Sequence, residues 1–180
     1  MAIATGSSLL HVGGAFSSVS GEIRSGLAAW REQTLVTGPV QGPFCAGQVV
    51  SVPFVANGTF GQANQFQVEL SNSLGSFNNP LTIGTMPGTT SGTIVANLPI
   101  GTTQGSAYRL RVSSTLPMFN GVDNGQALQI DEPAVWYFDG DGDGDGDLLI
   151  DSLSCSQPQG YVDNDSLLFC GQRTPVGIFH

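Results

Sequence analysis

The chain has 180 residues, of which 25 are glycine and 10 are proline, and 40% of the residues are hydrophobic. This length and apolar content allow one sizeable core and favour one compact domain with appendages over two full domains. The formal net charge is −9, with no lysine and five arginines against 14 acidic residues, which excludes the basic surface that binding to nucleic acid or to an anionic membrane requires.

The first part of the chain, residues 8 to 30, predicts a strand, a turn and a second strand. Leu9, Leu10 and Val12 lead into a pair of glycines, and Leu27 to Trp30 form a second apolar run. The opening MAIATGSSLL lacks the basic and apolar regions of a signal peptide, and nowhere do 18 apolar residues follow one another, so we expect no membrane insertion. We interpret the chain as either artificially started at Met1 or a piece of a longer secreted protein.

From about residue 35 the pattern changes to short segments in which apolar and polar residues alternate. These segments are 48–56, 64–72, 80–86, 92–99, 107–115 and 127–130. Alternation with a period of two indicates half-buried strands, and glycine, proline and asparagine supply the turns between them. About seven strands in a domain of about 100 residues is typical of an immunoglobulin-like sandwich. We therefore predict an all-β fold, an immunoglobulin-like two-sheet sandwich followed by a calcium-loop appendage.

The appendage contains the run FDGDGDGDGDLLID, residues 138–151, in which aspartate and glycine alternate. Carboxylates at this density repel one another, and a hard divalent cation relieves the repulsion. Asp139, Asp141 and Asp143 fall at positions 1, 3 and 5 of a calcium loop, with a glycine at position 6. Asp145 offers its backbone carbonyl at position 7, and Asp147 lies at position 9, binding directly or through water.

Position 12 of that loop departs from the helix-flanked pattern. It holds Ile150 where a bidentate glutamate is needed, and Asp151 follows one residue late. We therefore expect extended flanks and weak binding of Ca²⁺, in the range of about 10⁻⁴ to 10⁻³ M that is typical of extracellular modules. Magnesium suits the run less well because it requires stricter geometry. The alternative interpretation of the run is a flexible acidic linker.

The three cysteines have no zinc-site spacing. Cys155 and Cys170 enclose a short polar loop, and a disulfide between them would contribute about 3 kcal/mol and imply an oxidising compartment. Cys45 is then left over, and we interpret it as a small buried apolar residue.

Two stretches resemble modules of exported bacterial proteins. Residues 8–30 resemble one unit of bacterial β-propeller repeats through Val12, Gly13, Gly14, Phe16, Gly21, Arg24, Gly26 and Ala28. Residues 44–130, with PFCAGQVVSVPFVANGTFGQANQFQVELSNSLGSF, IGTMPGTTSGTIVANLP and GSAYRLRVSST, resemble immunoglobulin-like domains of secreted or surface proteins of gliding-type bacteria. That resemblance implies a structural or adhesive module without catalytic residues.

The acidic segment resembles the calcium-binding repeats, akin to thrombospondin type 3 repeats, that follow such sandwiches. The matching residues are Trp136, Tyr137, Asp139, Asp141, Asp143, Cys155, Gly160, Tyr161, Val162 and Cys170. The resemblance implies that the three aspartates are ligands and that both cysteines belong to the repeat. Asp163 and Asp165 could lend distal ligands.

An enzymatic function has little support in the sequence. The two histidines are His11 and the terminal His180, so a catalytic triad would depend on His11 alone. Clustered aspartates joined by glycines do not hold the fixed separation that a glycosidase needs. Arg109 and Arg111 alternate outward on one predicted strand, as a solvated face or as a dock for the acidic segment.

We therefore divide the chain into a partial propeller-like hairpin (1–34), an immunoglobulin-like sandwich (35–131) and a calcium-binding, disulfide-closed tail (132–180). The predicted function is a non-enzymatic structural or adhesive module of a secreted or cell-surface bacterial protein. Its expected partners are calcium, other domains of a larger parent chain and a cell-surface or polysaccharide ligand. The alternatives are a carbohydrate-binding accessory module, which requires an exposed aromatic platform or polar cleft, and a catalytic domain with a pocket around His11.

Overall fold

The computed structural model describes residues 33–164 in full and, before them, the backbone of five strands. These five are β1 (Ala2–Gly6), β2 (Leu9–Gly13), β3 (Ser18–Val19), β4 (Glu22–Ile23) and β5 (Leu27–Arg31). All 18 elements of the described part are strands, which confirms the predicted all-β class. In the same part of the chain there is no helix with the length and apolarity to cross a membrane.

The first strands form a small antiparallel sheet in the order β1-β2-β5, and β3 pairs with β4. The register of β2 and β5 runs from Leu9 opposite Arg31 to Gly13 opposite Leu27. These are the two strands that the apolar runs in residues 8–30 predict. The side chains of residues 1–32, His11 among them, lie outside the described part of the structure, as do residues 165–180 with Cys170.

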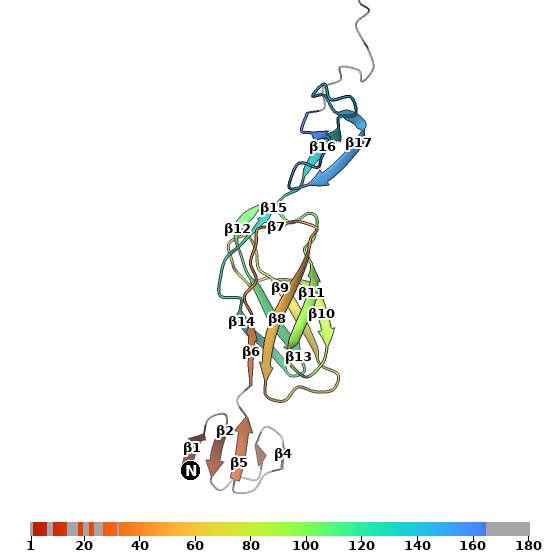
Figure 1. Cartoon of the computed structure of the whole chain (residues 1–180). Coiled ribbons are helices and arrows are strands. Elements are labelled where there is room, and N and C mark those ends of the chain that lie inside the picture. Colours follow the sequence, from red (N-terminus) through yellow and green to blue (C-terminus); the bar gives the residue numbers. More distant parts are fainter. Residues whose placement is uncertain are drawn as a thin grey trace, which may run out of the picture.

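Seven strands build the sandwich, in the order β10-β9-β13-β14-β6-β8-β11. Their bounds are β6 (Thr34–Thr37), β8 (Val49–Asn57), β9 (Gln65–Leu70), β10 (Leu81–Pro87), β11 (Gly92–Asn97), β13 (Leu110–Thr115) and β14 (Met118–Asp123). A parallel pairing of Val122 with Val36 joins β14 to β6, and every other pairing is antiparallel. Figure 1 shows β6, β8 and β11 facing β9 and β13 as the second layer.

A smaller sheet closes one end of the sandwich. It consists of β12 (Gly105–Tyr108), β15 (Leu128–Asp131) and β7 (Phe44–Cys45), with β15 in the middle. β15 pairs antiparallel with β12 and parallel with β7, so that Ile130 lies opposite Phe44 and Asp131 opposite Cys45. The chain leaves the sandwich from this sheet.

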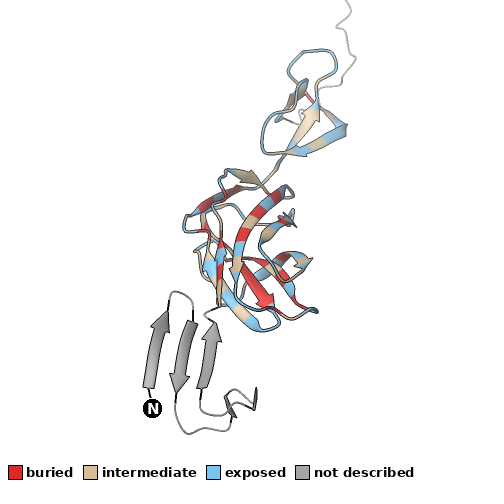
Figure 2. Cartoon of the chain, turned by 60° about the horizontal axis from the view of Figure 1, so that its bottom comes forward, coloured by how far each residue is buried: buried red, intermediate tan, exposed pale blue. Residues whose placement is uncertain are grey.

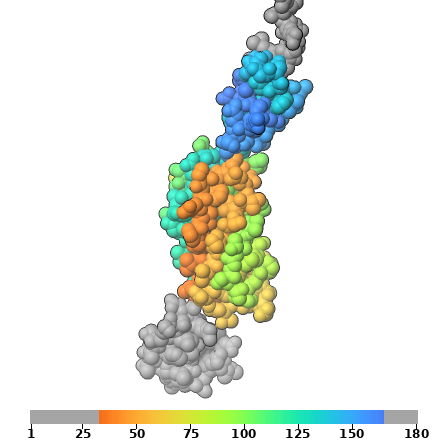
Figure 3. Space-filling model, viewed as in Figure 1, coloured from red at the N-terminus to blue at the C-terminus, as the bar shows by residue number. Residues whose placement is uncertain are grey.

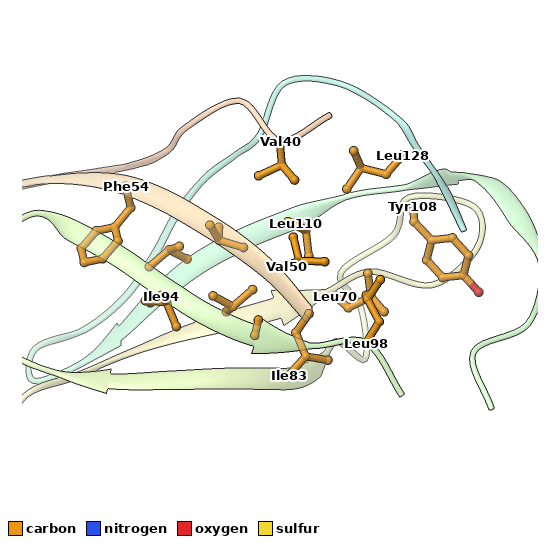
Figure 4. Packing of buried hydrophobic residues seen from close by; sticks show 14 of the residues in the cluster. Val40, Val50, Phe54, Leu70, Ile83, Ile94, Leu98, Tyr108, Leu110 and Leu128 are labelled. Carbon is orange, nitrogen blue, oxygen red and sulfur yellow. The ribbon is translucent and has the colours of Figure 1, made fainter. Parts of the chain in front are cut away.

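The core lies between the two layers because each long strand turns alternate side chains inward. On β8 Val50, Val52 and Phe54 are buried, whereas the residues between them are exposed or half-buried. The ring of Phe54 lies 4.6 Å from that of Phe66 on β9, which joins the layers directly. Figure 4 shows such side chains converging between the strands, and the buried residues in Figure 2 are concentrated in the sandwich.

The alternating segments predicted six strands that the structure contains as β8, β9, β10, β11, β13 and β15. The predicted segment 107–115 also contains the end of β12, and the structure has β6, β7 and β14, which the sequence did not single out. β7 is only two residues long, and the side chains of β14 alternate only between exposed and half-buried, so neither strand has a buried apolar face. The short extended pieces expected around the aspartate run are β16 (Ala134–Phe138) and β17 (Asp147–Ser154), and β18 (Tyr161–Val162) pairs beside β16.

Both arginines of the fully described part are paired on the outer face of the sandwich. The Arg111 guanidinium donates to the Glu69 carboxylate at 2.6 and 2.9 Å and lies 4.4 Å from the centre of the Phe77 ring. Arg109 donates to Asp123 at 3.1 Å. The interpretation of this pair as a dock for the acidic segment is therefore wrong, because both charges are used within the sandwich.

Tyr108 fixes the corner between β12 and β13. Its ring is buried, and its hydroxyl donates to the backbone carbonyl of Thr103, five residues earlier, at 2.8 Å. Burial removes the phenol from water and thereby raises the pKa of Tyr108 above its usual value. The Tyr108 side chain thus fills part of the core with its ring and donates a hydrogen bond to a backbone carbonyl with its hydroxyl.

The contrast between buried and exposed leucines gives a first prediction. Leu110→Ala should lower the free energy of unfolding by about 2–5 kcal/mol because Leu110 is fully buried and leaves a cavity. Leu74→Ala should change it by less than about 0.5 kcal/mol because Leu74 is 84% exposed. Chemical denaturation of both variants measures the difference, and equal losses would contradict the placement of the core.

The raised pKa of Tyr108 gives a second prediction. Tyr108→Phe should cost about 0.5–1.5 kcal/mol at neutral pH because the bond to the Thr103 carbonyl is lost. The pKa of Tyr108 is higher in the folded state than in the unfolded state. The contribution of Tyr108 to the free energy of unfolding is therefore complete below the pKa of an unfolded tyrosine, near 10. This contribution is lost as the pH rises through the pKa of the folded state. Denaturation from pH 8 to 11.5 should show a smaller alkaline loss of stability in the variant than in the parent protein, and parallel curves would argue against this role.

Candidate metal centre and its attachment to the sandwich

The tail after the sandwich is a three-stranded sheet in the order β17-β16-β18. Its main hairpin starts where Ala134 pairs with Ser154 and ends where Phe138 pairs with Asp147. The aspartate run joins these two strands at the end away from the sandwich (Figure 1). Between residues 134 and 164, Gly146 is the only buried residue. Residues 134–164 of the tail therefore have no apolar core to hold them together.

Glycine conformation gives the aspartate loop its tight course. Gly142 and Gly144 have φ values of +74° and +92°, a region that residues with a Cβ rarely adopt. Gly146 is required for lack of space, because a Cβ at this position would clash with the Cβ of Tyr137. The alternating glycines therefore let the backbone turn closely around the aspartate side chains.

Asp139 organises the loop through its carboxylate. One oxygen accepts the N–H of Gly142 at 2.7 Å, and the other accepts the N–H of Gly144 at 3.1 Å. The N–H of Asp139 itself donates to the Gly160 carbonyl at 2.9 Å, which ties the start of the loop to the segment before β18. The Asn164 side-chain amide donates to the Gly144 carbonyl at 2.9 Å. The loop is thus held from both sides.

This course brings three of the six predicted metal-binding side chains together. Asp139, Asp141 and Asp143 each offer one carboxylate oxygen, and these oxygens lie within 4.8 Å of one another. We call these three residues the Asp triad. Asp139 is half-buried, and the other two are exposed. The Asp triad could hold a metal ion, because carboxylate oxygens at this separation suit a hard cation.

The other three predicted side chains lie outside the Asp triad. The carboxylate of Asp147 accepts the N–H of Leu149 at 2.9 Å, and Asp151 lies opposite Tyr137 in the hairpin ladder. Asp145 follows the triad directly and donates its N–H to the Asp143 carboxylate at 3.0 Å. The roles of Asp145 as a carbonyl ligand and of Asp147 and Asp151 as ligands remain predictions.

The charge of the Asp triad has no basic partner in the fully described part of the chain. Residues 33–164 contain no lysine and only two arginines, Arg109 and Arg111, and both pair with carboxylates of the sandwich. Like charges this close to one another raise the free energy of the metal-free loop. Within residues 33–164, no side chain supplies the positive charge that would neutralise the loop.

The disulfide of the tail differs from the predicted one. Cys155 is bonded to Cys45, 110 residues earlier, so the predicted Cys155–Cys170 disulfide is wrong. The hairpin returns Cys155 to the base of β17, next to Cys45 at the end of β7, whereas spacing along the chain suggested a local loop. The interpretation of Cys45 as a buried apolar residue is also wrong, because it is half-buried and covalently bonded.

Sequence reasoning missed two further contributors to the loop, Asn164 and the carbonyl of Gly160. Asn164 lies between two aspartates in a segment that the resemblance includes, but a single asparagine has no sequence signal for a contact 20 residues away. A backbone carbonyl has no signal at all. Comparison with known proteins adds nothing to this assignment, since no protein-family model and no curated protein matches the chain.

Fragment mapping tests the disulfide directly. A protease that cleaves before aspartate separates the segment with Cys155, residues 151–162, from that with Cys170, because it cuts at Asp163 and Asp165. Under non-reducing conditions the 151–162 fragment should have the combined mass of itself and the fragment with Cys45, and reduction should separate them. A fragment that joins Cys155 to Cys170 would contradict the structure.

Proposed function

We propose that the chain is a non-enzymatic structural or adhesive module of a secreted or cell-surface bacterial protein, in which Ca²⁺ bound at the Asp triad rigidifies the tail. The observation that carries the proposal is the triad itself, three adjacent carboxylates without a basic partner among residues 33–164. They belong to a segment with one buried residue. Units below about 70 residues usually need disulfides or metals in addition to a core, and this one has a disulfide and a candidate metal centre.

The chemistry of the ligands favours calcium over other ions. The Asp triad offers only oxygen, which hard cations prefer, and it lies on a loop that glycines make adaptable. Calcium accepts flexible geometry with six to eight oxygens, so water and backbone carbonyls can complete its shell. Magnesium demands stricter octahedral geometry and is the less suitable ion.

Two features of the sandwich support an immunoglobulin-like assignment. Its two layers pack face to face, and alternate side chains of their strands form one core between them. The bond from the Tyr108 hydroxyl to the Thr103 carbonyl resembles the tyrosine corner of such domains, in which a tyrosine near the start of a strand bonds to backbone a few residues upstream. These features agree with the resemblance of residues 44–130 to domains of exported bacterial proteins.

The disulfide supports a location outside the cytoplasm. Structural disulfides persist in oxidising compartments, and calcium sites of weak affinity suit the high calcium concentration outside cells. Both features of the tail thus favour the same environment.

Carbohydrate binding has no comparable support. That alternative requires an exposed aromatic platform, and Phe138 is the only aromatic residue among the large exposed hydrophobic side chains of residues 33–164. Its ring packs against the edge of Tyr161 at 5.4 Å and is 37% exposed. Retention on immobilised polysaccharides would nevertheless favour this alternative.

Calcium should stabilise the tail measurably. At 10 mM, about 10 to 100 times the expected dissociation constant, Ca²⁺ should add about 1.4–2.7 kcal/mol, because it binds the folded loop and not the unfolded chain. Calorimetry with calcium, with magnesium and with a chelator measures the shift in melting temperature. A melting temperature that changes with neither calcium nor chelator would contradict the proposal.

Matched variants locate the ion. Asp141→Asn removes one charge from the Asp triad and should abolish most of the calcium-dependent shift. Glu132→Gln removes the same charge from an exposed residue that is not a predicted ligand and should keep most of it. Equal loss in both variants would show a diffuse response to negative charge instead of a site.

A further inference from the structure

We infer that the Cys45–Cys155 disulfide is an orientation lock, which sets the direction in which the tail leaves the sandwich. Only Glu132 and Pro133 separate the last sandwich strand, β15, from the first tail strand, β16. A single backbone connection would let the tail rotate about these two residues. The disulfide supplies a second covalent connection from the other strand of the same hairpin, β17.

The two connections close a small ring. On the tail, Ala134 pairs with Ser154, and the next residue is Cys155. On the sandwich, Asp131 pairs with Cys45 in the parallel register of β15 and β7. The backbone connects Asp131 of the sandwich to Ala134 of the tail, and the disulfide connects Cys45 and Cys155 beside them. Because the two connections lie side by side, each blocks rotation of the tail about the other.

The sandwich side of the lock is itself rigid. The turn after Cys45 begins with Ala46, which is buried in the core and donates its N–H to the Asp131 carbonyl at 2.9 Å. Gly47 donates to the Leu98 carbonyl at 3.0 Å, and the Cys45 N–H donates to the side chain of Gln48 at 2.8 Å. The sulfur of Cys155 lies 3.5 Å from the Asp131 carbonyl oxygen, so both connections meet at one point.

Packing between the two parts is too open to replace the disulfide. A recess of about 330 Å³ lies at the junction, lined by residues of both parts, including Ile100, Pro133 and Leu153. Ile100 is 60% exposed and Leu153 is 55% exposed, so apolar contact does not seal the junction. No tail strand packs extensively on a sandwich strand among the described elements. Figure 3 shows the tail joined to the sandwich through a narrow neck.

The lock and the candidate ion act at opposite ends of one hairpin. The disulfide lies at the base, beside the pairing of Ala134 with Ser154, and the Asp triad begins directly after Phe138 at the far end. The inference therefore does not depend on calcium. Loss of the disulfide should release the direction of the tail, whereas loss of the ion should loosen the loop.

Cys155 is exposed, so a dithiol can reach the bond. Dithiothreitol reduces it by thiol–disulfide exchange: the dithiol becomes a cyclic disulfide, and each of the two cysteine sulfurs gains one electron and one proton. Reduction of the folded protein thus opens the lock without any substitution.

Residual dipolar couplings of backbone amides test the inference, because they report the orientation of each part in a common frame. The full chain with Cys170→Ser, which prevents thiol exchange, is measured in saturating calcium. Couplings of the sandwich and of the hairpin should fit one alignment tensor when the disulfide is intact. Two forms lack the disulfide: the Cys170→Ser protein that also carries Cys45→Ser and Cys155→Ser, and the reduced Cys170→Ser protein. In both forms, the hairpin should require its own alignment tensor, with a magnitude at least twofold smaller than that of the sandwich.

The outcomes decide between orientation and other roles. A single tensor that persists without the disulfide would overturn the inference. Unfolding of the sandwich in both the variant and the reduced protein, seen as loss of its amide shifts, would also overturn it by showing a role in folding. Adding a chelator to the protein with an intact disulfide should change amides of the 139–146 loop and leave the base of the hairpin aligned, so a failure of calcium binding is recognised separately.

Discussion

The disulfide between Cys45 and Cys155 is the constraint on which the arrangement of the described chain depends. It spans 110 residues of sequence, and it joins the residue after β17 to the end of β7, which pairs with β15, the strand that leads into the tail. A bond across so long a loop removes much entropy from the unfolded chain, about 4–5 kcal/mol in the chain-entropy account. It also makes the tail a covalent extension of the sandwich instead of a pendant segment.

The sandwich and the tail are stabilised by different means. In the sandwich, a buried core and paired charges suffice, and the structure of residues 33–164 contains no buried side-chain polar atom without a partner. Its two arginines neutralise its own carboxylates, Glu69 and Asp123. The tail has neither a core nor a basic residue in its described part, so its stability depends on the disulfide and, in the proposed function, on a bound ion.

The sequence predicted those features that local patterns encode. Alternation along β8 placed Val50, Val52 and Phe54 inward, and the spacing of the aspartates anticipated the grouping of the Asp triad. It could not identify the partner of Cys155, because Cys45 becomes a neighbour only after the sandwich has folded and β7 has paired with β15. The same holds for Asn164, whose contact with the loop depends on β18 lying beside β16. The missed features all depend on tertiary contacts between distant segments.

The disulfide and the proposed calcium site both depend on the medium around the protein. A disulfide needs an oxidising compartment, and a weak calcium site needs a high calcium concentration. In a reducing environment with little calcium, the repulsion within the Asp triad would be unrelieved, and the hairpin would keep a single flexible connection at Glu132 and Pro133. The core and the ion pairs of the sandwich are internal and depend on neither condition, although a reduced sandwich loses the entropic contribution of the disulfide. Ordering of the tail would thus follow the folding of the sandwich and the arrival of the chain in an oxidising, calcium-rich medium.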